Sequence, residues 1–181
     1  MTNYISILRG INVSGQKSII MADLKTLYEN MGFSNVKTYV QSGNVVFQTK
    51  AEKIEILEQK IHGQIKSKYG FEVPVIVMTV DKLKTIINSN PFKDDSMKDP
   101  QFLHVTFLQK KPESYNQESV LSKKSGREEI VFTDEAIYMY CPNGYGNSKL
   151  SNNLFENKLK VTATTRNWKT TNELLNLVNS I

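Results

Sequence analysis

The chain has 181 residues, 39% hydrophobic and 23% charged, so it can bury a sizeable core and is too apolar for general disorder. Its single cysteine excludes an intramolecular disulfide and favours a reducing cytoplasm. Its net charge of +5 indicates either an anionic partner or a solvated basic helix face. Because there is no signal-peptide pattern and no apolar stretch near the ~20 residues of a membrane span, we expect a cytoplasmic protein with no membrane partner.

The first half of the chain alternates strand and helix patterns. Residues 3–9 carry apolar side chains on both alternating sets, which predicts a central strand. Ser42-Gly43 separates two β-rich runs and predicts a hairpin. Further along, Thr79 is a candidate cap for a helix through Ile87. The remaining expected elements are a helix at 21–32, strands at 35–41 and 44–49, a helix at about 52–69 ended by Gly70, and a strand at 73–78.

A polar stretch with two prolines at 90–101 interrupts this pattern and predicts a domain boundary. We therefore expect a first lobe at 1–90, a linker at 91–101 and a second lobe at 102–181. The second lobe is expected to contain a strand at 102–108, a short helix at 112–121 with Pro112 near its start, strands at 128–133 and 136–141 joined by Asp134-Glu135, and helices at 150–159 and about 167–178.

The resulting order is β-α-β-β-α-β-α followed by β-α-β-β-α-α, a repeat of topology without shared sequence. Each half has the order of a split β-α-β, or ferredoxin-like, arrangement. The sequence therefore predicts an α+β fold of duplicated ferredoxin-like lobes, with antiparallel or mixed sheets and helices on one face.

The first candidate site lies at the end of the first strand and at the first hairpin. Arg9 and Asn12 either bind an anion or an amide-bearing ligand, or pin the loop through bonds to carbonyls, and both readings stay open. Ser42 and Asn44 lie at the hairpin tip, where local turn bonds are favoured over ligand binding.

The second candidate site lies near the carboxyl end. The loop residues Tyr145, Asn147, Ser148 and Lys149 lead into one helix, for which Ser148 or Ser151 is a candidate cap, and Arg166 and Asn167 lead into another. Cations beside two helix amino termini would suit an anion. Trp168, the only tryptophan, starts the last helix, and a core anchor is its favoured role.

Catalytic patterns are weak. His62 and His104 are isolated, which gives no metal-ligand spacing, and Cys141 has no recognisable His partner. The sequence therefore predicts no metal, names no cofactor, and leaves open whether the chain is an enzyme.

Several blocks in order, "MADLKTLYENMGF", "VKTYVQSGNVVF" and "GNSKLSNNLFENKLKVTATTRNWKT", resemble the domain-of-unknown-function family 1697 over nearly the whole chain. The resemblance implies a compact bacterial α+β protein with duplicated ferredoxin-like lobes and no established reaction. The family's characteristic polar positions fall on Arg9, Gly10, Asn12, Gln41, Ser42, Gly43, Asn44, Ser148, Lys149, Arg166, Asn167 and Trp168.

Three functions follow from these patterns. The leading hypothesis is a protein that binds a phosphate-bearing or other anionic ligand, with a nucleotide or nucleic acid as partner. The alternatives are an enzyme acting on a small polar substrate between the lobes and a protein interaction module whose polar motifs are structural. The sequence does not fix the oligomeric state.

Overall fold

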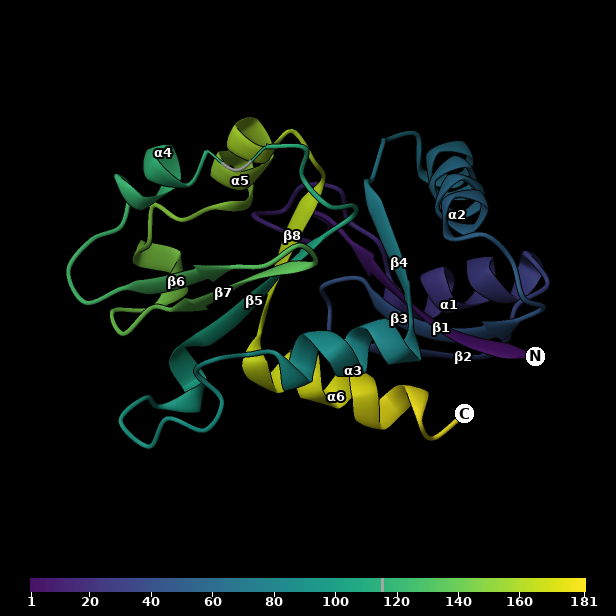
Figure 1. The fold of residues 1–181 in the computed structure, drawn as a ribbon. Helices are drawn as coiled ribbons and strands as arrows, with labels where there is room; N and C mark the ends of the chain where they lie inside the picture. The colour runs from purple at the N-terminus through teal and green to yellow at the C-terminus, as the bar shows by residue number, and fades with distance from the viewer. Residues whose placement is uncertain (115) are drawn as a thin grey trace. The chain divides into compact units, whose positions relative to one another are not determined.

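The computed structural model describes residues 1–114 and 116–181 and has an α+β fold with two four-stranded antiparallel sheets (Figure 1). The chain divides into two compact units. The first unit comprises Met1–Lys84 with Glu173–Ile181, and the second comprises Thr85–Asn172. Helices α3 (Val80–Asn88) and α6 (Trp168–Val178) each contribute residues to both units. The boundary expected at 91–101 stays a prediction.

The first sheet has the order β2-β3-β1-β4. As predicted, β1 is central, because it pairs with both β3 and β4 and its residues Tyr4 to Leu8 are buried. The strands are β1 (Thr2–Leu8), β2 (Ser34–Tyr39), β3 (Asn44–Thr49) and β4 (Val75–Thr79).

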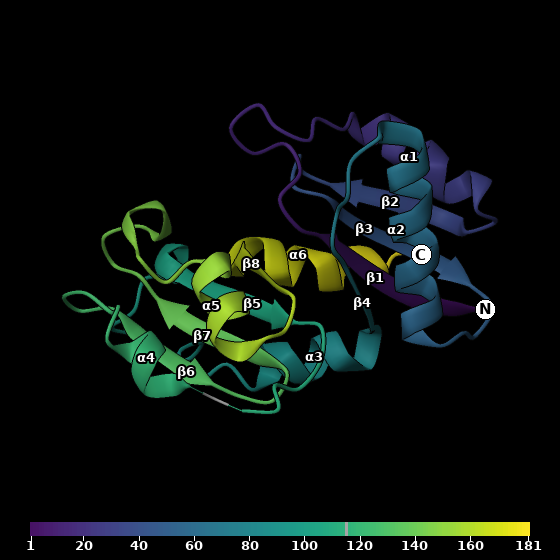
Figure 2. The same ribbon diagram turned by 90° about the horizontal axis from the view of Figure 1, so that it is seen from above.

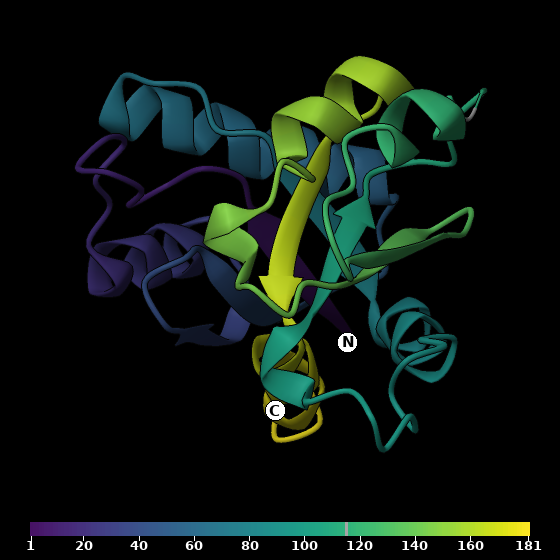
Figure 3. The same cartoon turned by 90° about the vertical axis from the view of Figure 1, so that its left-hand side faces the viewer.

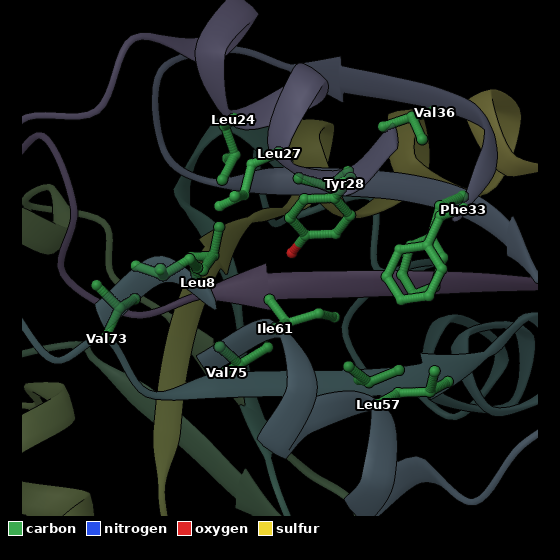
Figure 4. Close-up of a cluster of buried hydrophobic side chains, with 14 of the residues drawn as sticks. Leu8, Leu24, Leu27, Tyr28, Phe33, Val36, Leu57, Ile61, Val73 and Val75 are labelled. Atoms are coloured by element: carbon green, nitrogen blue, oxygen red, sulfur yellow. The ribbon is translucent and has the colours of Figure 1, made fainter. Parts of the chain in front are cut away.

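Helices α1 (Met21–Asn30) and α2 (Ile54–Tyr69) lie on one face of this sheet (Figure 2). Their apolar residues recur at helical spacing and form a core with alternate residues of β1, β3 and β4 (Figure 4). Tyr28 reaches from α1 toward β1, where its hydroxyl lies 2.8 Å from Ser6 Oγ. Gly70 ends α2 at a φ of 77°, as expected of a glycine C-cap.

The second sheet has the order β6-β7-β5-β8. Its strands are β5 (Leu103–Leu108), β6 (Glu129–Phe132), β7 (Ala136–Tyr140) and β8 (Ala163–Asn167). Helices α4 (Gln117–Leu121) and α5 (Asn152–Leu159) contribute Val120, Phe155 and Leu159 to a core with one face of this sheet. Short 3₁₀ segments, η1 (Pro100–Phe102) and η2 (Tyr145–Asn147), precede β5 and α5.

Two expectations for the second half were wrong. The helix expected at 112–121 begins only at Gln117, because Asn116 is its N-cap and accepts a hydrogen bond from Ser119 N at 3.2 Å. Tyr115, inside the expected helix, lies outside the described residues. Residues 163–167, where no strand was expected and the last helix was expected to begin at about 167, form β8 and pair with β5.

With β8 included, both units follow the order β-α-β-β-α-β-α, and their central pairings have the same register. Tyr4 pairs with Thr79 in the first sheet, and His104 pairs with Asn167 in the second. The last strand residue then caps the next helix in both units, since Thr79 Oγ1 accepts from Lys82 N and Asn167 Oδ1 accepts from Thr170 N. The strands β4 and β8 can therefore be compared residue by residue.

Candidate functional site

Strand β8 is polar where β4 is apolar. In register, the buried residues Ile76, Val77 and Met78 of β4 correspond to Thr164, Thr165 and Arg166 of β8. Burying polar groups costs free energy unless they form hydrogen bonds, and the first sheet shows that this position accepts hydrophobic residues. Packing alone does not account for the polar sequence of β8.

The Thr165 hydroxyl is the centre of a hydrogen-bond network on the face of the sheet that bears α5. It lies 2.6 Å from Asn152 Oδ1, 2.7 Å from Thr106 Oγ1 and 3.2 Å from the Tyr145 hydroxyl. Because Asn152 Oδ1 can only accept, Thr165 donates to it and accepts from Tyr145 and Thr106. The two polar segments near the carboxyl end of the sequence therefore meet at this hydroxyl.

His104 lies beside this network, directly opposite Asn167. Its ring stacks on Tyr145, with ring centroids 4.9 Å apart. Its Nδ1 lies 3.2 Å from the carbonyl oxygen of Phe102, which can only accept, so Nδ1 carries the hydrogen. Burial lowers the pKa of His104 below its ordinary value of 6.5, so at neutral pH the ring is neutral and Nε2 is an acceptor.

Arg166 occupies a different environment from the one expected. It lies in β8 instead of at a helix start, and alternation along the strand places it on the face opposite Thr165. Its Nη1 donates to Thr164 Oγ1 and to the Thr165 carbonyl, both at 2.9 Å. Burial lowers the pKa of Arg166 to about 10, which keeps the guanidinium charged at neutral pH.

The amino termini of α5 and α6 are capped by the chain itself. Ser151 Oγ accepts from Leu154 N at 3.3 Å, as one of the two candidate caps predicted. Asn167 Oδ1 accepts from Thr170 N at 2.7 Å. An anion at either helix start would therefore compete with a cap that is already in place.

The other residues expected at this site lie in the loop before α5. Asn147 Nδ2 donates to the Asn143 carbonyl at 2.8 Å, and Ser148 Oγ accepts from Leu150 N at 3.0 Å. The structure thus brings Tyr145 to β8. Lys149 is exposed in the loop before α5, whereas Arg166 is buried in β8. The two cations therefore do not lie in matching positions at two helix starts, as the sequence suggested.

A groove of about 330 Å³ lies where β8 passes into α6. Figure 3 shows this junction, with the yellow strand leading directly into the yellow helix. Trp168 is half-buried and lines the groove together with Pro100, Gln101, Asn167 and Lys169. The indole is therefore not the fully buried core anchor that the sequence favoured, and one part of it is accessible to a ligand.

The residues expected at the first site make local bonds. Asn12 uses both ends of its amide, donating to the Ile19 and Gln41 carbonyls and accepting from Ile19 N. Asn44 is buried and donates to the Tyr39 carbonyl and Ser42 Oγ. These bonds agree with a structural role, and ligand binding by Arg9, Asn12, Ser42 and Asn44 stays a prediction.

Sequence reasoning missed Thr106 and Asn152 and considered His104 as an isolated histidine without metal-ligand spacing. The available signal was the alternation of His104 and Thr106 with apolar residues along β5. Cys141 is buried, and burial raises its pKa to about 11, which does not favour a thiolate nucleophile.

The side chains and helices of residues 1–114 and 116–181 also bear on metal binding and on membrane insertion. No group of three or more His, Cys, Asp or Glu side chains there is placed to hold a metal ion. None of the helices there is long and apolar enough to span a membrane.

Comparison with known proteins agrees with the fold. Over 98% of both chains, the protein is similar to a solved structure described as the conserved bacterial protein SP0830 from Streptococcus pneumoniae, with a TM-score of 0.70 and 21% sequence identity. A search of curated proteins found no match. The model of the family described as "Protein of unknown function (DUF1697)" matches residues 1–138. The chain therefore belongs to the DUF1697 family.

Proposed function

We propose that the second unit binds an anionic ligand with a planar ring, namely a nucleotide, free or within a nucleic acid, in the groove beside Trp168. One observation carries the proposal: the partly exposed indole of Trp168 and the exposed Lys169 line the same groove. Stacking of a base on an aromatic ring contributes about 1–3 kcal/mol, and a neighbouring ammonium attracts phosphate. The net charge of +5 supports an anionic partner.

The polar residues of β8 support the same location. The Thr165 hydroxyl accepts a hydrogen bond from Tyr145 and so holds it against the sheet. Asn167, the last residue of β8, lines the groove. A rigid strand-to-helix junction is a better platform for binding than an exposed loop, because less conformational entropy is lost on binding.

The same order of elements in the two units supports classing each as a ferredoxin-like repeat. In such a duplicated protein, one repeat can diverge toward binding while the other keeps an apolar core. The contrast between β4 and β8 is of this kind.

The proposal is tested by titrating the purified protein at low salt with AMP, ATP and a short single-stranded oligonucleotide. Trp168 is the only tryptophan, so any change in tryptophan fluorescence reports on this groove. We expect saturable quenching, together with a rise in Tm as ligand is added. For an oligonucleotide the affinity should fall steeply as salt rises, because condensed counterions are released.

Two matched variants locate the phosphate. Lys169→Gln removes the cation that lines the groove, whereas Lys149→Gln removes another exposed cation, before α5. We expect only Lys169→Gln to weaken binding. No fluorescence or Tm response to any of these ligands would refute the proposal, and weakening by Lys149→Gln alone would place the site at the loop.

A second candidate, an enzyme acting on a small polar substrate, is favoured by His104. Its neutral ring has Nε2 as a proton acceptor, and His104 pairs across the sheet with Asn167, which lines the groove. If this function is correct, turnover of a substrate that fits the groove should be lost in His104→Gln, while its binding is retained.

A further inference from the structure

We infer that the groove recognises the hydrogen-bonding edge of a nucleobase, through one donor and one acceptor whose identities the fold fixes. The inference rests on the proposed function and adds the chemistry of the ring that the groove selects. The donor is Asn167 Nδ2 and the acceptor is Gln101 Oε1, and both residues line the groove with Trp168.

The orientation of the Asn167 amide follows from its role as a helix cap. Its Oδ1 accepts from Thr170 N at 2.7 Å, and a backbone N–H can only donate. The NH₂ group must therefore occupy the other end of the amide. In the described part of the chain this NH₂ group makes no hydrogen bond, and the exposed side chain offers it to a ligand.

The orientation of the Gln101 amide follows from Asp99. Gln101 Nε2 donates to Asp99 Oδ2 at 2.6 Å, and Gln101 N donates to Asp99 Oδ1 at 3.0 Å. Since a carboxylate can only accept, the NH₂ end is held by Asp99 and Oε1 is the outward acceptor. Asp99 accepts hydrogen bonds from both the backbone N–H and the side-chain NH₂ group of Gln101. These bonds keep Oε1, and not the NH₂ group, as the end of the amide that a ligand can reach.

A ring stacked on Trp168 would meet one donor and one acceptor at its edge. The matching edge carries an amino group next to an unprotonated ring nitrogen, as in adenine, where Asn and Gln amides form such pairs. A simple aromatic phosphate has the ring and the charge but lacks this edge. The groove should therefore distinguish AMP from phenyl phosphate, and also from the mononucleotide of unsubstituted purine, which lacks the amino group.

The test measures the affinity of the full chain for these three probes by Trp168 fluorescence, with the Tm shift as a second readout. We expect AMP to bind about fivefold more tightly than the purine mononucleotide, because a factor of about five in affinity corresponds to one net hydrogen bond. The affinity of AMP should exceed that of phenyl phosphate by a larger factor. Gln101→Met should weaken AMP binding about fivefold and leave the purine mononucleotide unchanged, because only AMP has a donor for Oε1.

Asn167→Ser keeps a side chain that can cap α6 and removes the amide donor. It should weaken AMP and the purine mononucleotide equally, since both have the ring nitrogen. Asn157→Ser, at an exposed position in α5, is the matched control and should change neither. Equal binding of AMP and the purine mononucleotide, with Gln101→Met acting on both alike, would overturn the edge inference while the proposed function stands. If AMP fails to bind while ATP or the oligonucleotide binds, the edge inference is overturned, and if none of these ligands binds the wild type, the proposed function itself has failed.

Discussion

Met78 and Arg166 occupy equivalent positions in the two sheets, since Met78 pairs with Ile5 and Arg166 pairs with Val105. Both side chains are buried, yet one is apolar and the other carries a charge. A buried guanidinium is costly unless it is well hydrogen-bonded, and Arg166 donates to Thr164 and to the backbone of Thr165. Because the equivalent position in the first sheet holds Met78, packing at this position does not require a charge.

Replacing Arg166 by the residue of the other unit tests whether the charge is required. Arg166→Met keeps most of the side-chain volume and removes the buried charge, so we expect the free energy of unfolding to change by less than about 1 kcal/mol. Arg166→Ala leaves a cavity and should cost about 2–4 kcal/mol. Urea denaturation of both variants measures the difference, and an equally large loss in the two would show that the charge itself holds the fold together.

The stability contribution of Trp168 should be smaller than that of a buried core residue. Full burial of such a ring makes substitution by Ala cost about 3–5 kcal/mol. Because Trp168 is only half-buried beside the groove, we expect Trp168→Ala to cost about 2 kcal/mol, measured by urea denaturation followed by circular dichroism. A cost of 4 kcal/mol or more would mean that the indole is a core anchor and a poor stacking surface.

Gly43 should tolerate no side chain. Its φ is 71°, and a Cβ there would lie 2.6 Å from Leu8 Cβ and 2.9 Å from Ile11 Cδ1. Gly43→Ala is expected to cost about 2–3 kcal/mol from overpacking and backbone strain. Gly10→Ala is the control, because Gly10 has a similar φ of 72° but open space around its Cβ position. If the two variants lower Tm equally, strain alone accounts for the effect.

Hydrophobic periodicity made most of the fold predictable, as the strand β1 and the helices α1 and α2 illustrate. Strand β8 escaped prediction because Ala-Thr-Thr-Arg-Asn has no apolar alternation, and only pairing with β5 makes it a strand. The candidate site was likewise predictable only where local sequence patterns indicate it. The sequence singled out Tyr145 and Asn167, but the meeting of Tyr145 with Thr165, Thr106 and Asn152 depends on register between distant strands, which local patterns do not encode.

His104 should make stability depend on pH. Burial lowers its pKa in the folded protein below the ordinary value of 6.5, so between these two values the unfolded chain binds a proton that the folded protein does not. The free energy of unfolding should therefore fall as pH is lowered through about 6.5, and the fall should stop below the folded pKa. Well above pH 7 the ring is neutral in both states and contributes no pH dependence.

Urea denaturation of the wild type and of His104→Gln from pH 5 to 8 isolates this contribution. Other groups titrate in both proteins, so the informative quantity is the difference in free energy of unfolding between them. The amide keeps a donor for the Phe102 carbonyl and does not titrate, so the wild type should lose stability relative to the variant only at the acidic end of the range. A difference that stays constant across the range would show that the pKa of His104 is the same in the folded and unfolded chains. It would also remove the basis for treating Nε2 as a neutral acceptor held in place by burial, and with it the argument for His104 as a proton acceptor beside the groove.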